Sequence, residues 1–129
     1  MDQSLVVAIV VFGGIALIAF IVTLAMTIRR YRSLPAIVPD HFGVSGEPNR
    51  YGPRPMAFVL NAGSLIVLVA WALTVEKAID SEPHRLMPIV VFGTVADALL
   101  IIFFYLQRGI LNVASGRVAK MDVFRFWRN

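Results

Sequence analysis

The chain has 129 residues, of which 58% are hydrophobic and only 16% are charged, and its mean hydropathy is +0.76. An ordinary soluble domain is about half apolar and about a quarter charged, so this composition indicates a membrane protein. The chain has no cysteine, which excludes disulfides, thiolate metal sites and cysteine nucleophiles. The net charge of +4 does not predict nucleic acid as a partner, because no soluble segment alternates aromatic and basic residues.

Three long apolar stretches predict three transmembrane helices, because a bilayer core about 30 Å thick needs roughly 20 apolar residues. We place these spans at about 4–28, 56–75 and 87–106. Asp97 is the only charged residue inside the third span. The predicted fold class is therefore an all-α membrane protein, with the whole chain forming a single membrane domain.

Basic residues set the predicted orientation, because short loops rich in Lys and Arg stay in the cytoplasm. The loop 29–55 holds five arginines, and the tail 108–129 is also basic, whereas the second loop has only Lys77 and Arg85. We therefore expect a multi-pass protein of a bacterial inner membrane, with its N-terminus outside and its C-terminus in the cytoplasm.

The basic tail 108–129 is predicted to be an interfacial amphipathic segment. Val118, Met121 and Phe124 recur at helical spacing, and most of the basic residues lie off that stripe. Such a helix lies in the headgroup plane with its apolar side in lipid and its basic side toward anionic headgroups. The alternative is a frayed tail, because the segment is short and contains Asp122.

The loop 29–55 is rich in proline and glycine, which exclude a continuous helix and require specific turns. Leu34, Ile37, Val38 and Phe42 give this loop an apolar side that can fold back onto the helix ends. The loop motif consists of Leu34, Pro35, Pro39, His41, Phe42, Gly46, Pro48, Tyr51 and Gly52.

This loop motif resembles the signature loop of a family of small bacterial membrane proteins. That family includes the immunity protein against a sporulation-delaying peptide toxin. The resemblance extends roughly from Leu5 to Val75 and rests on the spacing of the prolines, the His-Phe pair and the Gly-x-Pro sequence. It implies a membrane protein, with an immunity-like role as one possibility. The immunity protein is longer and has additional spans, so this chain departs from it in length.

The polar residues of the loop are candidates for a site of chemistry. Asp40, His41 and Glu47 offer oxygen and nitrogen ligands of the kind that divalent metals use, but their spacing matches no known metal motif. No nucleophile or second carboxylate stands at a readable partner position for His41. A histidine here is expected to hold the loop together by hydrogen bonding the backbone of its neighbours. We therefore predict no catalytic residue, no metal site and no cofactor.

Asp97 lies near the middle of the third span, where a charged group costs at least about 2.5 to 3.5 kcal/mol. Counting about 1.5 Å per residue from the inner ends of the spans places Asn61 and Ser64 at similar depths. These two residues are three apart and share a helix face. We predict an intramembrane polar cluster of Asp97, Asn61 and Ser64 that holds the helices together. The alternative is a proton-carrying carboxylate.

The sequence thus favours a non-enzymatic structural or accessory subunit that packs within a larger membrane assembly or with copies of itself. Three helices bury little surface, so the expected partners are membrane lipids and other membrane protein subunits or a second copy, and not nucleic acid. Two alternatives remain open. One is an immunity-like or receptor-like protein that recognises a peptide or a protein, and the other is a proton-coupled transporter centred on Asp97.

Overall fold

The computed structural model describes residues 3–80 and 86–116, and its long helices are α1 (Gln3–Tyr31), α2 (Val59–Asp80) and α3 (Leu86–Ala114). Each is long and apolar enough to cross a membrane, with a short 3₁₀ helix preceding α2 in the second span. This confirms the predicted all-α membrane protein with three transmembrane helices. The part of the predicted amphipathic tail beyond residue 116 lies outside the described residues.

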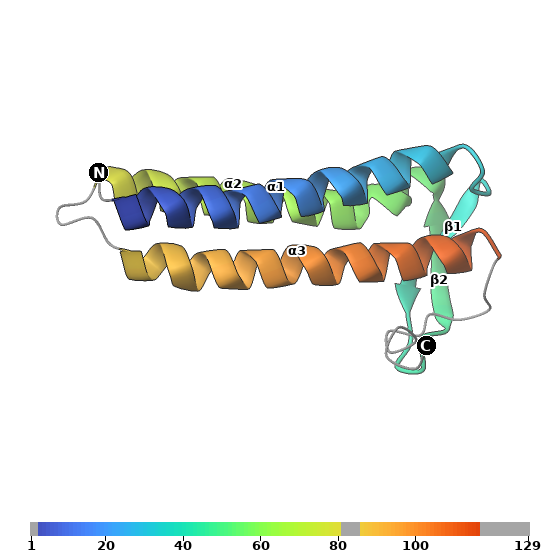
Figure 1. The fold of residues 1–129 in the computed structure, drawn as a ribbon. Helices are drawn as coiled ribbons and strands as arrows, with labels where there is room; N and C mark the ends of the chain where they lie inside the picture. The colour runs from blue at the N-terminus through green and yellow to red at the C-terminus, as the bar shows by residue number, and fades with distance from the viewer. Residues whose placement is uncertain (1–2, 81–85, 117–129) are drawn as a thin grey trace, which may run out of the picture.

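The three helices form one elongated bundle (Figure 1). α1 and α3 run in the same direction and α2 runs in the opposite direction, so the N-terminal ends of α1 and α3 lie beside the C-terminal end of α2. α1 packs most extensively on α3. The end of the bundle where α1 and α3 finish and α2 begins carries a small two-stranded sheet, and we call this end of the bundle the hairpin end.

The helices are longer than the predicted spans. α1 and α3 have 29 residues each, and at about 1.5 Å per residue each is roughly 43 Å long, against a hydrocarbon core of about 30 Å. α2 continues past residue 75 to Asp80, and α3 continues past residue 106 to Ala114. A helix keeps its backbone hydrogen bonds in headgroup water as well as in lipid, so hydropathy marks the membrane boundary and not the helix end.

The proline-rich loop forms a β-hairpin, which the sequence did not predict. Strands β1 (Ile37–Phe42) and β2 (Pro48–Pro53) pair antiparallel with an irregular register, and the 3₁₀ helix η1 (Arg54–Phe58) leads into α2. The turn is closed by a hydrogen bond from Gly46 N to Gly43 O at 3.0 Å. Gly46 has a φ of 85°, a conformation that favours glycine.

The hairpin is fastened to the bundle by a small apolar core. Leu34 and Val38 pack with Ala57 of η1 and Leu111 of α3, and all four side chains are buried. This confirms the predicted folding back of the loop for Leu34 and Val38. Ile37 differs from the prediction because its side chain is 61% exposed.

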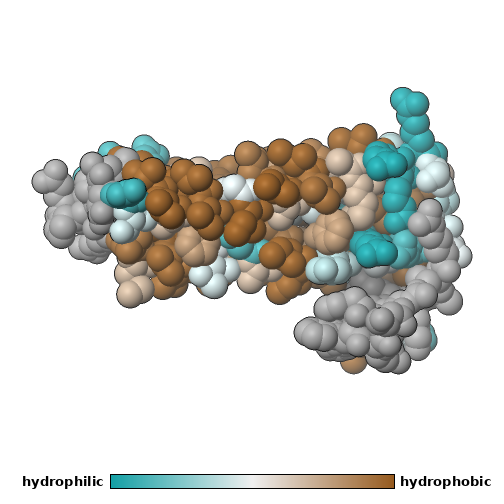
Figure 2. Space-filling view, in the orientation of Figure 1, coloured by the Kyte–Doolittle hydropathy of each residue, from teal (hydrophilic) through white to brown (hydrophobic). Residues whose placement is uncertain are grey.

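A second apolar core lies at the opposite end of the bundle and contains Leu5, Trp71, Ala78 and Ile89. Beside it, α1 and α3 approach closely, because a Cβ added to Gly93 would lie 2.5 Å from Cγ of Phe12. Small residues at helix crossings allow such approach in membranes. Outside these cores, apolar side chains cover much of the flank of the bundle between its more polar ends (Figure 2).

Candidate functional site

All three helices meet in a buried polar layer, formed by Thr27, Ala57, Asn61 and Gln107, near the hairpin end. The Gln107 Nε2 group donates to Ala57 O at 2.7 Å and to Thr27 Oγ1 at 2.8 Å, and it lies 3.4 Å from Asn61 Oδ1. An amide nitrogen has two hydrogens, so the two shorter contacts use both of them. One side chain of α3 thus joins α1, η1 and α2.

Local structure explains why the polar layer forms at this level. Ala57 lies in η1, where i to i+3 hydrogen bonds replace the α-helical pattern and carbonyl geometry is poorer. Its carbonyl oxygen is therefore a suitable acceptor for a side chain from a neighbouring helix. Thr27 is oriented by its own bond, since its Oγ1 donates to Thr23 O at 3.0 Å. The hydroxyl oxygen can then accept from Gln107.

The sequence predicted a polar cluster of Asp97 with Asn61 and Ser64, but in the structure Asp97 makes no hydrogen bond to either residue. Asp97 is only 7% exposed, and neither carboxyl oxygen has a hydrogen-bond partner among the described residues. Ser64 Oγ instead donates to Leu60 O at 2.8 Å. Asn61 Oδ1 faces Gln107, and Asn61 Nδ2 has no partner in the described structure. All three predicted residues are buried, but they form no hydrogen-bonded cluster.

The helix register accounts for this difference. Phe12, Trp71 and Gly93 lie at one level, because the Phe12 and Trp71 rings are 6.3 Å apart and Gly93 abuts Phe12. Asp97 lies four residues, or about 6 Å, from this level, and Ser64 lies seven residues, or about 10.5 Å, from it in the same direction. The two side chains are thus about one helical turn apart along the bundle. The depth count was wrong because α3 continues beyond its predicted inner end.

The polar residues of the loop motif hold the hairpin together. Arg50 Nε donates to Asp40 Oδ1 at 2.9 Å, and the Asp40 side chain is only 9% exposed. A Cβ at Gly52 would lie 2.7 Å from Asp40 Oδ2, so glycine makes room for this ion pair. His41 Nδ1 contacts the Asn49 Oδ1 atom, so its partner is a side chain and not the neighbouring backbone that the sequence predicted. The described residues contain no group of three or more His, Cys, Asp or Glu side chains that could hold a metal.

The remaining motif residues shape the strands. Pro39 is paired with Tyr51 and Phe42 with Pro48. Proline has no backbone N–H, so its presence in both strands limits the pairing of a further strand. Pro35 lies just before β1 and its carbonyl accepts a hydrogen bond from an arginine of η1 at 3.3 Å. Tyr51 is 58% exposed.

Arg30 has a role that the sequence did not reveal. Its guanidinium donates to Leu111 O at 3.1 Å, to Asn112 Oδ1 at 2.9 Å and to Ser115 Oγ at 2.8 Å. These acceptors lie in the last turn of α3 and just after it, where the helix dipole makes a positive charge favourable. Arg30 therefore fastens the end of α1 to the end of α3. The sequence assigned it only to membrane orientation.

Comparison with known proteins gives a family match over part of the chain. Residues 18–64 match a family described as a domain of unknown function (DUF1648). The matched segment contains the second half of α1, the hairpin and the first residues of α2, and so includes the α1 and α2 sides of the polar layer. No curated protein and no solved structure matches the chain. Over residues 18–64, which hold the hairpin, the chain is therefore similar to a domain family whose function is unknown, and the matched segment ends before α3.

Proposed function

We propose that this chain is a small non-enzymatic membrane subunit that packs against other membrane proteins or against copies of itself. The supporting observation is the uncovered flank of the bundle. Only 17%, 22% and 28% of the most apolar segment of the first, second and third spans is buried within the chain. Most of the apolar surface of every span is therefore available to lipid or to a partner helix.

The use of the polar groups agrees with a structural role. Gln107 and Arg30 join helices to one another, and Asp40 and Arg50 close the hairpin. Proton-coupled transport usually relies on a series of ionisable groups along the pathway. Apart from Asp97, the three apolar stretches 4–28, 56–75 and 87–106 contain no Asp, Glu, Lys, Arg or His. We therefore favour the accessory subunit over a transporter centred on Asp97.

Crosslinking from single cysteines would test this proposal, because the chain has no cysteine of its own. Cysteine would replace Val10, Ile66 or Met87, which are 65%, 70% and 71% exposed and lie on α1, α2 and α3. In native membranes we expect one of these flanks to give an adduct of defined mass in high yield. Ala16 is fully buried and provides the control position, from which no adduct is expected. Absence of an adduct from all three flanks would contradict the proposal.

We also propose that the hairpin end faces the cytoplasm of a bacterial inner membrane. Among the described residues, the acidic residues of the hairpin end are Asp40 and Glu47, and the charged residues of the opposite end are Glu76, Lys77 and Asp80. The arginines of the hairpin end are Arg29, Arg30, Arg32, Arg50, Arg54 and Arg108. Such an excess of basic residues favours the cytoplasmic side.

Thiol labelling of intact cells checks this orientation. A cysteine at Ser45, in the exposed hairpin turn, is expected to resist an impermeant maleimide, because the turn would lie inside the cell. A cysteine at Ser81, in the connection between α2 and α3, is expected to react. Both positions should react after the membrane is permeabilised. The reverse pattern in intact cells would place the hairpin outside.

A second proposal is immunity-like or receptor-like recognition of a peptide or protein by the hairpin. It is supported by the position of the hairpin, which extends beyond the side of α3 (Figure 1). Val44 in the turn is fully exposed and Tyr51 is 58% exposed, and aromatic residues are common in protein interfaces. The cysteine at Ser45 separates the two proposals: recognition predicts an adduct from the hairpin, and packing predicts one from a flank.

A further inference from the structure

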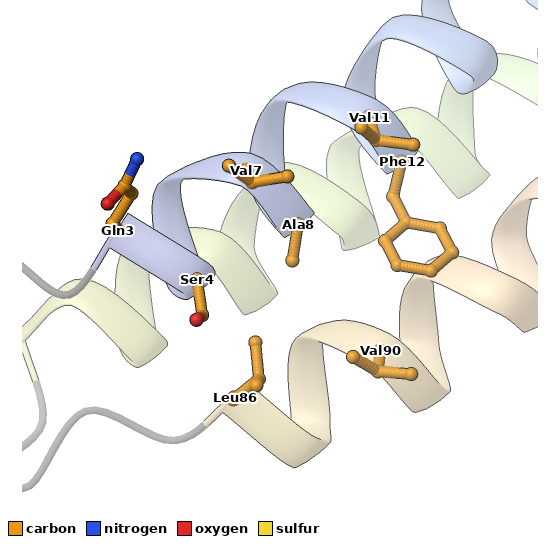
Figure 3. Close-up of a pocket in the computed structure, with 8 residues that line it drawn as sticks. All are labelled: Gln3, Ser4, Val7, Ala8, Val11, Phe12, Leu86 and Val90. Carbon is orange, nitrogen blue, oxygen red and sulfur yellow. The ribbon is translucent and has the colours of Figure 1, made fainter.

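A groove of about 520 Å³ lies between α1 and α3 at the end opposite the hairpin. Six residues of α1 between Gln3 and Phe12 line it, together with Leu86 and Val90 of α3. In Figure 3 the side chains of Ala8 and Phe12 point from α1 toward α3, and Leu86 points back toward α1. We call this feature the N-terminal groove.

The wall of the N-terminal groove is preformed. Ala8 and Phe12 pack against the apolar core that contains Trp71. The Phe12 ring lies edge-on to the Trp71 ring and abuts Gly93, which fixes its position. α1 and α3 come into close contact where Phe12 meets Gly93, so the groove ends there. Its volume falls within the range of about 300 to 1,000 Å³ that is usual for small-molecule sites.

We propose that the N-terminal groove binds one acyl chain of a phospholipid from the leaflet around the N-terminal end of α1. The polarity of the groove matches a lipid, because Gln3 and Ser4 lie at the end of the helix and the deeper lining residues are apolar. The length also matches. From Gln3 to Phe12 the groove follows nine residues, or about 13.5 Å, close to half of a core about 30 Å thick.

Other occupants fit this groove less well. A transmembrane helix is about 10 Å wide and would need a groove along the whole bundle, whereas this one ends where Phe12 meets Gly93. An extended peptide would leave backbone N–H and C=O groups unpaired against an apolar wall. Water would find few hydrogen-bond partners below Ser4. A single hydrocarbon chain has none of these difficulties.

Two neighbouring valines of α1 provide a matched test. Val11 lines the groove and is 49% exposed, whereas Val10 is 65% exposed and is not part of the lining. The protein would be purified in mild detergent from membranes containing phosphatidylethanolamine and phosphatidylglycerol, and retained lipid would be counted by native mass spectrometry. We expect one phospholipid per chain in the wild type and in Val10→Phe. In Val11→Phe, where the new ring fills the groove, occupancy should fall at least tenfold.

A second measurement does not depend on how the variants fold. In the Trp127→Phe background Trp71 is the only tryptophan, and it contacts the groove wall through Phe12. After reconstitution with lipid brominated on its acyl chains, quenching of Trp71 should persist when surrounding lipid is exchanged for unbrominated detergent. Quenching that disappears together with the bulk lipid would overturn the proposal, as would equal lipid retention by Val10→Phe and Val11→Phe.

Discussion

Replacement of Gly93 by alanine should destabilise the bundle by about 1 to 3 kcal/mol, the usual cost of adding a methyl group to a filled core. The new Cβ would lie 2.5 Å from Phe12 Cγ, 2.8 Å from Cδ1 and 2.9 Å from Cβ. The Phe12 Cβ is fixed to the backbone of α1, so a change of rotamer cannot relieve the overlap. α1 and α3 must move apart, and the contacts around them loosen. Unfolding of the purified protein by SDS in mixed micelles would measure the loss.

Gly63 provides the matched control on α2. A Cβ there would lie 3.6 Å from Phe103 Cε2, which is an ordinary van der Waals distance. Gly63→Ala should therefore be neutral or slightly stabilising, because alanine favours a helix over glycine by up to about 1 kcal/mol. Trimming Phe12 to alanine removes the two closest contacts, at Cγ and Cδ1, and should make Gly93→Ala less harmful, while the contact with Cβ at 2.9 Å remains. Equal effects of the two glycine substitutions would show that α1 and α3 do not pack as closely as described.

Gln107→Leu should weaken the bundle by about 1 to 3 kcal/mol. The substitution removes the only described donor to Thr27 Oγ1 and the side-chain donor to Ala57 O, and leaves both acceptors in an apolar interior. Hydrogen bonds between helices in membranes contribute about 0.6 kcal/mol on average and up to about 1.7 kcal/mol. Leucine has a similar volume, so the loss reports the polar contacts and not a cavity. The same SDS titration measures it.

Asp97→Leu is the control for Gln107→Leu, because it also replaces a buried polar side chain of α3 by leucine. The Asp97 carboxyl has no hydrogen bond to a described residue, and an aspartate near the middle of a span costs about 2.5 to 3.5 kcal/mol on insertion scales. Its replacement should leave the bundle equally stable or more stable. If Asp97→Leu were the more harmful substitution, the polar layer around Gln107 would not be the main polar contact between the helices.

The number and type of the spans could be predicted because hydropathy decides which segments enter lipid. The helix ends could not, since charged residues such as Glu76 and Lys77 continue a helix into headgroup water without penalty. The continuation of α3 past Gln107 also affected the predicted depths. The inner end of α3 was placed at residue 106, although the helix continues to Ala114, and Ser64 was therefore placed at the level of Asp97.

The hairpin escaped prediction because its strands lack the alternating pattern that marks a half-buried sheet. β1 and β2 contain prolines, which are rare in strands, and the pairing depends on contacts distant in sequence. Val38 is held by Leu111, which is more than seventy residues later in the chain. The turn at Gly46 and the need for specific turn residues were readable, but the strand pairing was not.

The role of Gln107 has a signal in the sequence. Leu100, Gln107 and Leu111 recur at helical spacing and are all buried on one face of α3. A glutamine on such a face must have partners within the membrane. Gln107 lies one residue beyond the predicted third span, 87–106, and no role was predicted for it. The partner of Arg30 had no comparable signal, because it depends on where α3 ends.

The bonds made by Arg30 also constrain the order in which the protein assembles. Its acceptors lie more than eighty residues later in the chain, and the donor to Thr27 is eighty residues later. While the ribosome is still making α3, α1 and α2 therefore lack both the hydrogen bonds of Arg30 to the end of α3 and the hydrogen bonds of Gln107. α3 therefore completes the bundle, and a nascent chain that stops before α3 leaves α1 and α2 without these bonds.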